Sequence, residues 1–279
     1  MRATLGVLVL SLLTGCSAVR LAYDNADLYL RWKIGSYIDV EGAQSEELDE
    51  RIDDFMAWHR LHALPKYVQI AEEGARRITR GIARQDALWG FDAVMAQAQE
   101  SLLAGTERLA PLLDRLTPEQ LKYLERGIAE DNRRFAREYL RGSERERRER
   151  RAALIADRVE DWVGGLTPAQ AERIRQFSER APLTNEMRER DRRRLQADVV
   201  AILRARQASE RLGERIAYWQ AGRDPAFAAA NEVFQGEMVA LVVDLDRTLS
   251  PDQRARAAGQ LRRFAQEMRA LAARAHRAP

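Results

Sequence analysis

The chain has 279 residues, and its 46 Lys and Arg residues nearly balance 43 Asp and Glu residues, giving a net charge of +3. This length is enough for one large or two small hydrophobic cores. Acidic residues are interspersed among the basic ones, so the charge pattern does not favour nucleic-acid binding. Cys16 is the only cysteine, which excludes an intramolecular disulfide.

The first 15 residues have the features of a secretory signal peptide. Arg2 precedes a short apolar run, residues 5–13, and small residues then lead to Cys16. The alternative is a plain N-terminal transmembrane anchor, but the run is well short of the roughly 20 residues that a spanning helix needs. The sequence therefore predicts an exported chain whose mature part begins near Cys16.

Leu13-Thr14-Gly15-Cys16 resembles the bacterial lipobox. The resemblance implies that Cys16 carries acyl chains such as palmitate and becomes the new N-terminus. Ser17 resembles the residue type found after the cysteine of outer-membrane lipoproteins. We expect a signal peptide at 1–15, a lipidated N-terminus with a short tether at 16–22, and a single all-helical domain at 23–279.

Aromatic residues follow this short tether closely. Tyr23, Tyr29 and Trp32 lie within the first part of the mature chain. Aromatic rings are favoured at the headgroup level of a membrane, so one hypothesis places these side chains against the bilayer surface. The alternative is that they form the core of the first helix.

Apolar residues then recur every three or four positions, which is the period of an α-helix. Good helix formers dominate the composition, and no strand pattern occurs. Pro65, Gly164-Gly165 and Asp224-Pro225 mark starts or breaks of helices. We expect an all-α fold, an elongated multi-helix bundle of roughly eight helices without a β-sheet. The apolar stripes include Leu48, Ile52, Phe55 and His59; Tyr67, Ile70, Gly74 and Ile78; Leu88, Phe91, Met95, Ala98 and Leu102; Leu121, Leu124, Ile128 and Phe135; Ile155, Val159 and Trp162; Leu195, Val199 and Ile202; Phe234, Met238 and Leu241; and Leu261, Phe264, Met268 and Leu271.

Residues 141–151 interrupt the apolar pattern with six Arg and three Glu. Gly142 can end one helix, and Ser143 with Glu146 can begin another as a capping box. The alternative is one long helix stabilised by ion pairs one turn apart, such as Glu144 with Arg148. In either case we interpret the segment as a solvated face, which is also where a sub-division of the domain would fall.

A helix-start motif occurs three times, at residues 116–120, 166–170 and 249–253. Thr or Ser is the N-cap, Pro occupies the first helical position, and Gln bonds back to the cap. Residues 40–44 form a degenerate fourth copy without Pro. The separations of 50 and 83 residues between the three copies argue against a solenoid of fixed repeat. The capping residues are Thr117 and Gln120, Thr167 and Gln170, and Ser250 and Gln253.

The Leu-Thr-x-x-Gln form of this motif resembles the paired motif of the Spy/CpxP periplasmic helical proteins. That resemblance covers only the motifs, and it implies an ATP-independent chaperone or a stress sensor. Helix capping alone also explains the same residues, so the motif does not by itself assign a function.

Trp58-His59-Arg60 and Tyr67 form the one candidate binding site in the sequence. His59 falls on an apolar stripe, so it is either a packed histidine with satisfied ring nitrogens or a polar hub that pairs with a carboxylate. In the second case Arg60 would bind a carboxylate or phosphate, and Trp58 would flank the ligand. His59 and His62 resemble a metal pair, but a third ligand is missing because the remaining histidine is His276. We therefore expect no metal and no cofactor.

Three segments together resemble a family of uncharacterised proteobacterial outer-membrane lipoproteins. They are residues 23–27, residues 40–44, and the segment from Trp58 to Tyr67 that contains Leu64-Pro65. The resemblance implies a location and an all-helical fold, and it carries no activity. We expect a non-enzymatic outer-membrane lipoprotein that acts as a scaffold or chaperone-like module for envelope proteins and does not bind nucleic acid. The alternative is an envelope enzyme or a small-ligand-binding protein with its site around Trp58.

Overall fold

The computed structural model describes residues 16–220 and 222–275. These residues form twelve α-helices and one π-helical segment, with no β-strand among them. The all-α fold predicted from the apolar periodicity is therefore confirmed. The helices outnumber the predicted eight because short interruptions, such as the one at Asn25, divide long helical stretches. The predicted signal peptide, 1–15, and His276 lie outside the described residues.

The first half of the chain contains six α-helices and the π-helical segment. They are α1 (Cys16–Asp24), α2 (Ala26–Ile38), α3 (Ala43–Trp58), η1 (His59–Ala63), α4 (Leu64–Arg80), α5 (Arg84–Leu113) and α6 (Pro118–Tyr139). The second half contains α7 (Glu144–Val163), α8 (Pro168–Arg180), α9 (Asn185–Arg204), α10 (Ala208–Ala217), α11 (Pro225–Asp246) and α12 (Pro251–Ala275).

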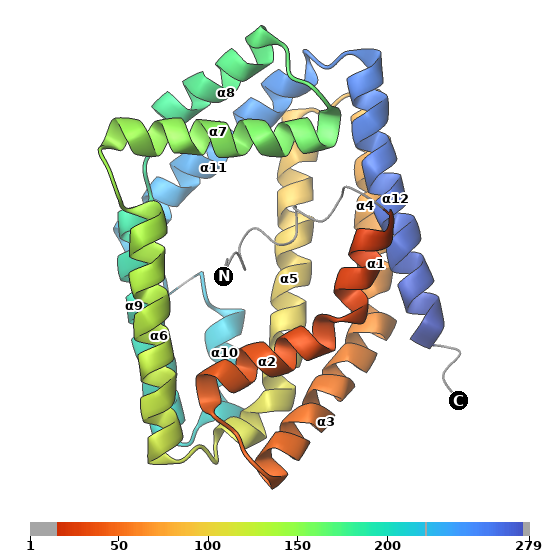
Figure 1. The fold of residues 1–279 in the computed structure, drawn as a ribbon. Coiled ribbons are helices and arrows are strands. Elements are labelled where there is room, and N and C mark those ends of the chain that lie inside the picture. Colours follow the sequence, from red (N-terminus) through yellow and green to blue (C-terminus); the bar gives the residue numbers. More distant parts are fainter. Residues whose placement is uncertain (1–15, 221, 276–279) are drawn as a thin grey trace.

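The helices are arranged as a closed frame (Figure 1). Helices α7, α8 and α11 form its upper edge, α6 and α9 its left edge, and α1, α4 and α12 its right edge. Helices α2, α3 and α10 lie at the lower edge, and α5 runs from α11 down to α3. Successive edges pack against each other, since α2 contacts α6, α9 contacts α11, and α7 contacts α12. The predicted multi-helix bundle is thus folded round into a ring.

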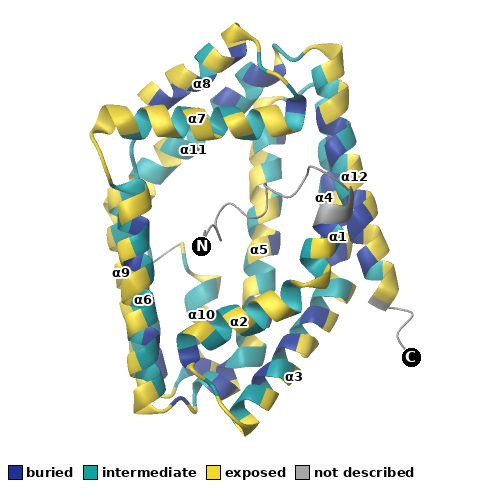
Figure 2. Ribbon diagram, in the orientation of Figure 1, coloured by how far each residue is buried: buried dark blue, intermediate teal, exposed yellow. Residues whose placement is uncertain are grey.

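Three separate hydrophobic clusters hold the frame together. Buried residues of α4 and α12 lie along the right edge (Figure 2), and they belong to one hydrophobic cluster. The largest cluster joins α2, α3, α5, α6, α9 and α10 through Ile38, Leu48, Ile52, Met56, Ala110, Leu112, Leu116, Leu124, Ile202, Leu203, Ala208 and Leu212. The second joins α1, α4 and α12 through Val19, Leu64, Val68, Ala71, Ala265, Met268 and Leu271. The third joins α8 to α11 through Ile174, Phe177, Ala181, Leu241 and Leu245.

Each predicted capping motif forms a capping box at the start of its helix. At α6, the backbone N–H of Gln120 donates to Thr117 Oγ1 at 3.2 Å, and the backbone N–H of Thr117 donates to Gln120 Oε1 at 3.0 Å. The same two bonds occur between Thr167 and Gln170 and between Ser250 and Gln253. Each box satisfies N–H groups that a helix start otherwise leaves unpaired.

The glutamines of these boxes also bond to glutamines at other helix starts, which are distant in the sequence. The side-chain amides of Gln170 and Gln253 exchange two hydrogen bonds, at 3.0 and 3.1 Å. Gln120 Nε2 donates to Gln44 Oε1 at 2.5 Å, and Gln44 belongs to the degenerate fourth copy. The two members of a pair are 76 residues apart in the first case and 83 in the second. The four motifs therefore form two pairs, one joined by two amide hydrogen bonds and the other by one.

The order of helices and motifs repeats along the chain. In each half a helix leads to a motif, a second helix, a third, a long helix, a second motif and a last helix; in the second half α10 is inserted between the third helix and the long one. Helices α2, α3, α4, α5 and α6 thereby correspond to α7, α8, α9, α11 and α12. The packing follows the same correspondence, because α2 contacts α6 as α7 contacts α12, and α4 contacts α12 as α9 contacts α6. The uneven motif spacing in the sequence is explained by a repeat that contains two motifs.

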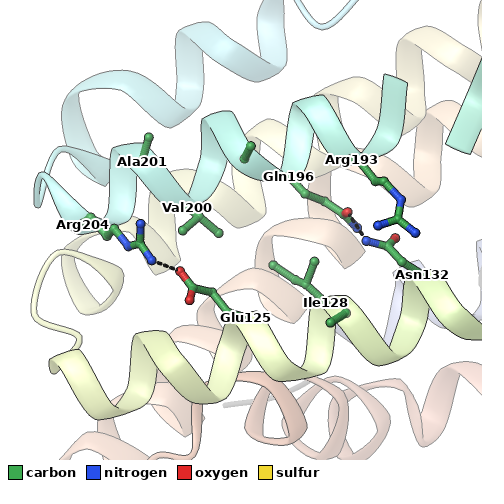
Figure 3. A pocket seen from close by; sticks show the side chains of 10 residues that line it. Glu125, Ile128, Asn132, Arg193, Gln196, Val200, Ala201 and Arg204 are labelled. Carbon is green, nitrogen blue, oxygen red and sulfur yellow. Dashed lines mark hydrogen bonds and ion pairs between the residues drawn. The ribbon is translucent and has the colours of Figure 1, made fainter. Parts of the chain in front are cut away.

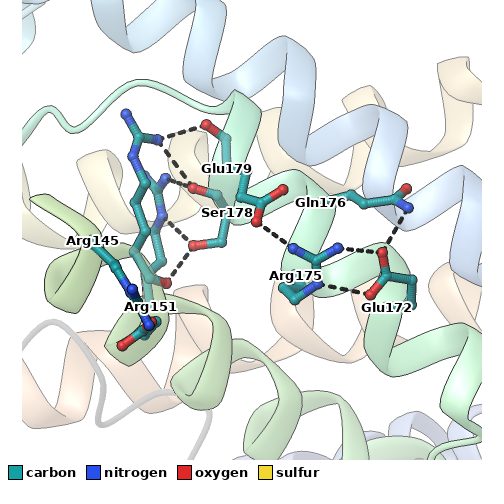
Figure 4. Close-up of polar contacts among 9 residues, drawn as sticks. Arg145, Arg151, Glu172, Arg175, Gln176, Ser178 and Glu179 are labelled. Atoms are coloured by element: carbon teal, nitrogen blue, oxygen red, sulfur yellow. Dashed lines mark hydrogen bonds and ion pairs between the residues drawn. The ribbon is translucent and has the colours of Figure 1, made fainter.

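The arginine-rich segment, 141–151, is divided as the capping-box alternative predicts. Gly142 adopts a φ of +85°, and Ser143 with Glu146 caps α7. Arg151, however, is half-buried: it donates to Ser178 Oγ and to the Ser178 carbonyl oxygen near the end of α8 (Figure 4), and also to the carbonyl oxygen of Ala181. Guanidinium groups suit this place because a helix C-terminus presents unpaired carbonyl groups. Burial lowers the pKa of Arg151 to about 10.

One described helix, α11, is long and apolar enough to cross a membrane by length and composition, with a mean hydropathy of 1.3. In the structure, 17% of that window is buried.

We expect the buried amide pair to stabilise the fold. Gln170 is fully buried, so Gln170→Ala leaves the Gln253 amide and the Thr248 carbonyl without their partner. Chemical denaturation should show a loss of roughly 2–3 kcal/mol in the free energy of unfolding. A matched control is Gln69→Ala on the exposed side of α4, which should change it by less than about 0.5 kcal/mol. Equal losses for the two variants would contradict a role for the pair, and a double-mutant cycle with Gln253→Ala isolates its coupling energy.

Candidate functional site

The predicted site lies on a π-helical turn. Helix α3 continues through η1, His59–Ala63, into α4. Pro65 follows at the first turn of α4, where its missing N–H and its ring are incompatible with a regular continuation of the preceding helix. A wider turn relieves that conflict, and turns of this kind are frequent at functional sites. The sequence predicted a helix start at Pro65 but not the π-helical turn before it.

Six rings gather around this turn and form what we call the aromatic cluster. Its members are Tyr23, Phe55, Trp58, His59, His62 and Tyr67. The ring centroid of His59 lies 5.7 Å from those of Tyr23 and Phe55 and 6.1 Å from that of Tyr67. The Arg60 guanidinium lies 5.8 Å from the Tyr23 ring centroid. The structure thus brings all four predicted site residues together, and it adds Tyr23 from α1.

His59 is bonded to a tyrosine and not to an acid. Its Nδ1 lies 2.9 Å from the Tyr23 hydroxyl oxygen. Among the described residues no carboxylate contacts His59. Burial, with a contribution from Arg60, lowers the pKa of His59 to about 4, so the ring is neutral near pH 7. In the neutral tautomer protonated at Nε2 the Tyr23 hydroxyl donates to Nδ1, and in the other tautomer Nδ1–H donates to the hydroxyl oxygen.

The two tyrosines of the cluster stay protonated. Burial raises the pKa of the Tyr23 hydroxyl and that of the Tyr67 hydroxyl above the ordinary value of 10. The cluster therefore offers neutral hydrogen-bonding groups and ring faces, which suit packing or the binding of an apolar group. No set of three or more His, Cys, Asp or Glu side chains able to hold a metal ion occurs in residues 16–220 and 222–275.

The cluster fixes α1, the first described helix. Helix α1, which the structure describes from Cys16 onward, carries Tyr23 to His59. It also contacts α12, where Arg20 pairs with Glu267 at 2.9 Å and Asp24 pairs with Arg274 at 3.0 Å. Where the sequence predicted a short tether at 16–22, the structure has a helix docked on the folded body.

An apolar groove adjoins the cluster and shares Phe55 with it. It has a volume of about 340 Å³ and lies between α2, α3 and α5. Its apolar lining consists of Leu30, Ile34, Ile52, Phe55, Leu102 and Leu109. Sequence reasoning did not assemble this groove, because its residues come from three helices that are separated in the chain. The apolar stripes predicted that these helices have apolar sides, but they did not predict that the sides meet in a groove.

A second groove, between α6 and α9, is more polar. It has a volume of about 400 Å³. Asn132 Nδ2 donates to Gln196 Oε1 at 2.8 Å across the groove, and Glu125 pairs with Arg204 at its other end (Figure 3). Asn132 Oδ1 is buried and has no hydrogen-bond partner among the described residues. Nothing in the sequence pattern singled out these residues.

The comparisons with known proteins identify a family without a known activity. A model described as a family of unknown function, DUF6279, matches residues 36–219. No curated protein and no solved structure matches the chain. The matched segment contains the π-helical turn, the pair formed by Gln44 and Gln120, and Gln170. Since it covers more than half of the sequence, the chain belongs to this family.

We expect the low pKa of His59 to make the fold sensitive to acid. The unfolded chain binds a proton on this histidine near pH 6.5, whereas the folded chain does so only near pH 4. Between these values the unfolded state binds more protons, so the free energy of unfolding falls as the pH is lowered, by up to about 3 kcal/mol. His59→Gln should remove this part of the slope in urea titrations between pH 7 and pH 4. Parallel pH profiles for wild type and variant would contradict the prediction.

Proposed function

We propose that this member of the DUF6279 family is a lipoprotein of the periplasmic face of the outer membrane. Residues 1–15 would be removed and Cys16 acylated, as the resemblance of Leu13 to Cys16 to the lipobox implies. The docking of α1 supports this proposal, because residues directly after the cysteine that would carry the lipid pack on the folded body. Two or more acyl chains are needed for stable anchoring, which is what acylation of a lipobox cysteine supplies.

We further propose that the chain is a non-enzymatic module that binds polypeptides through α5. Four large apolar side chains of this helix are exposed: Leu88 by 39%, Phe91 by 44%, Val94 by 42% and Leu102 by 53%. Their spacing of 3, 3 and 8 residues places them within one side of the helix. Leu102 also lines the apolar groove, so the exposed side of α5 leads into it. This apolar surface is the observation that carries the proposal, because contiguous exposed apolar patches mark interaction sites.

The ligand class that fits this surface is an apolar segment of an unfolded or partly folded envelope protein. The side of α5 with Phe91 and Leu102 offers side-chain contacts and little hydrogen bonding, so it selects for hydrophobicity over sequence. The paired capping motifs add a likeness to the Spy/CpxP proteins, whose chaperone role motivated the same expectation. The neutral state of His59 and its bond to Tyr23 favour a packing role for the aromatic cluster over an acid–base role.

The anchor is tested by metabolic labelling. Cells that produce the wild-type chain in the presence of radiolabelled palmitate should yield a labelled, shortened protein in the outer-membrane fraction of a sucrose gradient. Cys16→Ala should remain unlabelled and unprocessed, because no other cysteine is present. A wild-type protein that keeps its full length and carries no label would contradict the proposal.

The binding surface is tested by client aggregation. Purified wild-type protein should suppress light scattering by a chemically unfolded client protein. Phe91→Asp with Leu102→Asp should require about tenfold more protein for the same suppression, since a charge in an apolar contact costs at least about 1.4 kcal/mol. The matched control is Leu154→Asp on α7, whose side chain is 51% exposed and lies outside this surface. Equal suppression by all three proteins, or none by wild type, would contradict the proposal.

A further inference from the structure

Helices α1 and α2 carry a second set of exposed apolar side chains, close to Cys16. Leu21 is 65% exposed, Leu28 60% and Trp32 63%. Their spacing of 7 and 4 residues is that of one side of a helix. Only Asn25 interrupts the helical chain between them, with φ −111° and ψ 10°. We call Leu21, Leu28 and Trp32, together with Tyr29, the outer stripe.

The opposite sides of the same helices are occupied by the fold. Val19 of α1 is buried in the cluster with α4 and α12. Leu30 and Ile34 of α2 pack against the largest cluster, and Tyr23 bonds to His59. Both helices are therefore apolar on two sides. Internal packing buries one side of each helix and leaves the outer stripe uncovered.

The charged side chains of α1 and α2 are mostly held in ion pairs with the rest of the fold. Arg20 pairs with Glu267, Asp24 with Arg274, and Arg31 with Asp49 and Asp53. Asp27 has no ion pair among the described residues, and it is turned about 100° from Leu28 around the helix. Neutralised charges lower the cost of taking this surface out of water.

The position of the outer stripe identifies what covers it. At 1.5 Å per residue, Leu21 lies about 8 Å along the helix from Cys16 and Trp32 at most about 24 Å. A lipid on Cys16, with no tether before the folded body, keeps this stripe within reach of the bilayer surface. Leu, Trp and Tyr side chains are those that favour the interface between headgroups and acyl chains.

We propose that the outer stripe of α1 and α2 inserts into the headgroup region of the membrane that holds the lipid anchor. This inference rests on the proposed acylation of Cys16. The two helices then lie in the plane of the interface, and the frame has a fixed orientation on the membrane. Of the three aromatic residues that the sequence placed near the headgroups, Tyr29 and Trp32 belong to the stripe, and Tyr23 is turned inward to His59.

Spin labels on single introduced cysteines test the proposal. The acylated Cys16 is the only native cysteine, so Leu28→Cys or Trp32→Cys supplies the only free thiol. The acylated full-length protein is reconstituted in vesicles of phosphatidylethanolamine and phosphatidylglycerol. Collision of the label with oxygen, which concentrates in the bilayer, is compared with collision with a water-soluble nickel chelate. The matched control is Leu154→Cys, which is also exposed but lies on α7.

We expect labels at 28 and 32 to show a ratio of oxygen to nickel accessibility several-fold above that at 154. High nickel accessibility at all three positions would overturn the proposal, because the stripe would then face water. Low accessibility to both reagents at 28 and 32 would also overturn it, since a protein partner or a second copy would then cover the stripe. Palmitate labelling of the same samples separates the two proposals: an acylated protein with a water-exposed stripe refutes the insertion alone, whereas an unlabelled protein refutes the anchor and the insertion with it.

Discussion

The frame depends on glutamine side chains, each of which bonds both within its own helix start and to a second helix start. Gln170 completes the cap of its own helix through Thr167 and joins that helix start to Gln253. Its side chain is fully buried, where an unpaired amide would be costly. The start of α8 therefore has one favourable position relative to α12. The equivalent bond between Gln120 and Gln44 fixes the opposite corner, and the apolar clusters then fill the edges between these corners.

Local features of this fold were predictable from the sequence, and contacts between distant segments were not. The caps at Thr117 and Thr167 follow from residue types within four positions, so the sequence predicted them. The partner of each glutamine is 76 or 83 residues away, and no local pattern indicates it. Apolar periodicity likewise identified the all-α class, because it shows which side of a helix is buried. It does not show against which helix, so the ring arrangement was not predicted.

The candidate site illustrates the same limit. His59 was placed on an apolar stripe with two interpretations, and the choice depended on a partner from another helix. Tyr23 is that partner, and it comes from a segment that the sequence marked as a short tether followed by an aromatic stretch. The π-helical turn escaped prediction because Pro65 is an acceptable helix start by every local rule. The grooves were not predicted, because each is lined by helices that are far apart in the chain.

Two helices stand outside the repeated order: α10, between α9 and α11, and α1, at the start of the described chain. Helix α6 leads to α7 through residues 140–143, so the second half has no counterpart of the helix that begins at Cys16. Two similar units joined in one chain associate at any dilution, because the linkage replaces a concentration-dependent encounter. If Cys16 is acylated as proposed, one attachment serves both repeated sets of helices. The assembly is then polar: the half that contains α2 lies next to the attachment point, and the other half is held away from it by the frame.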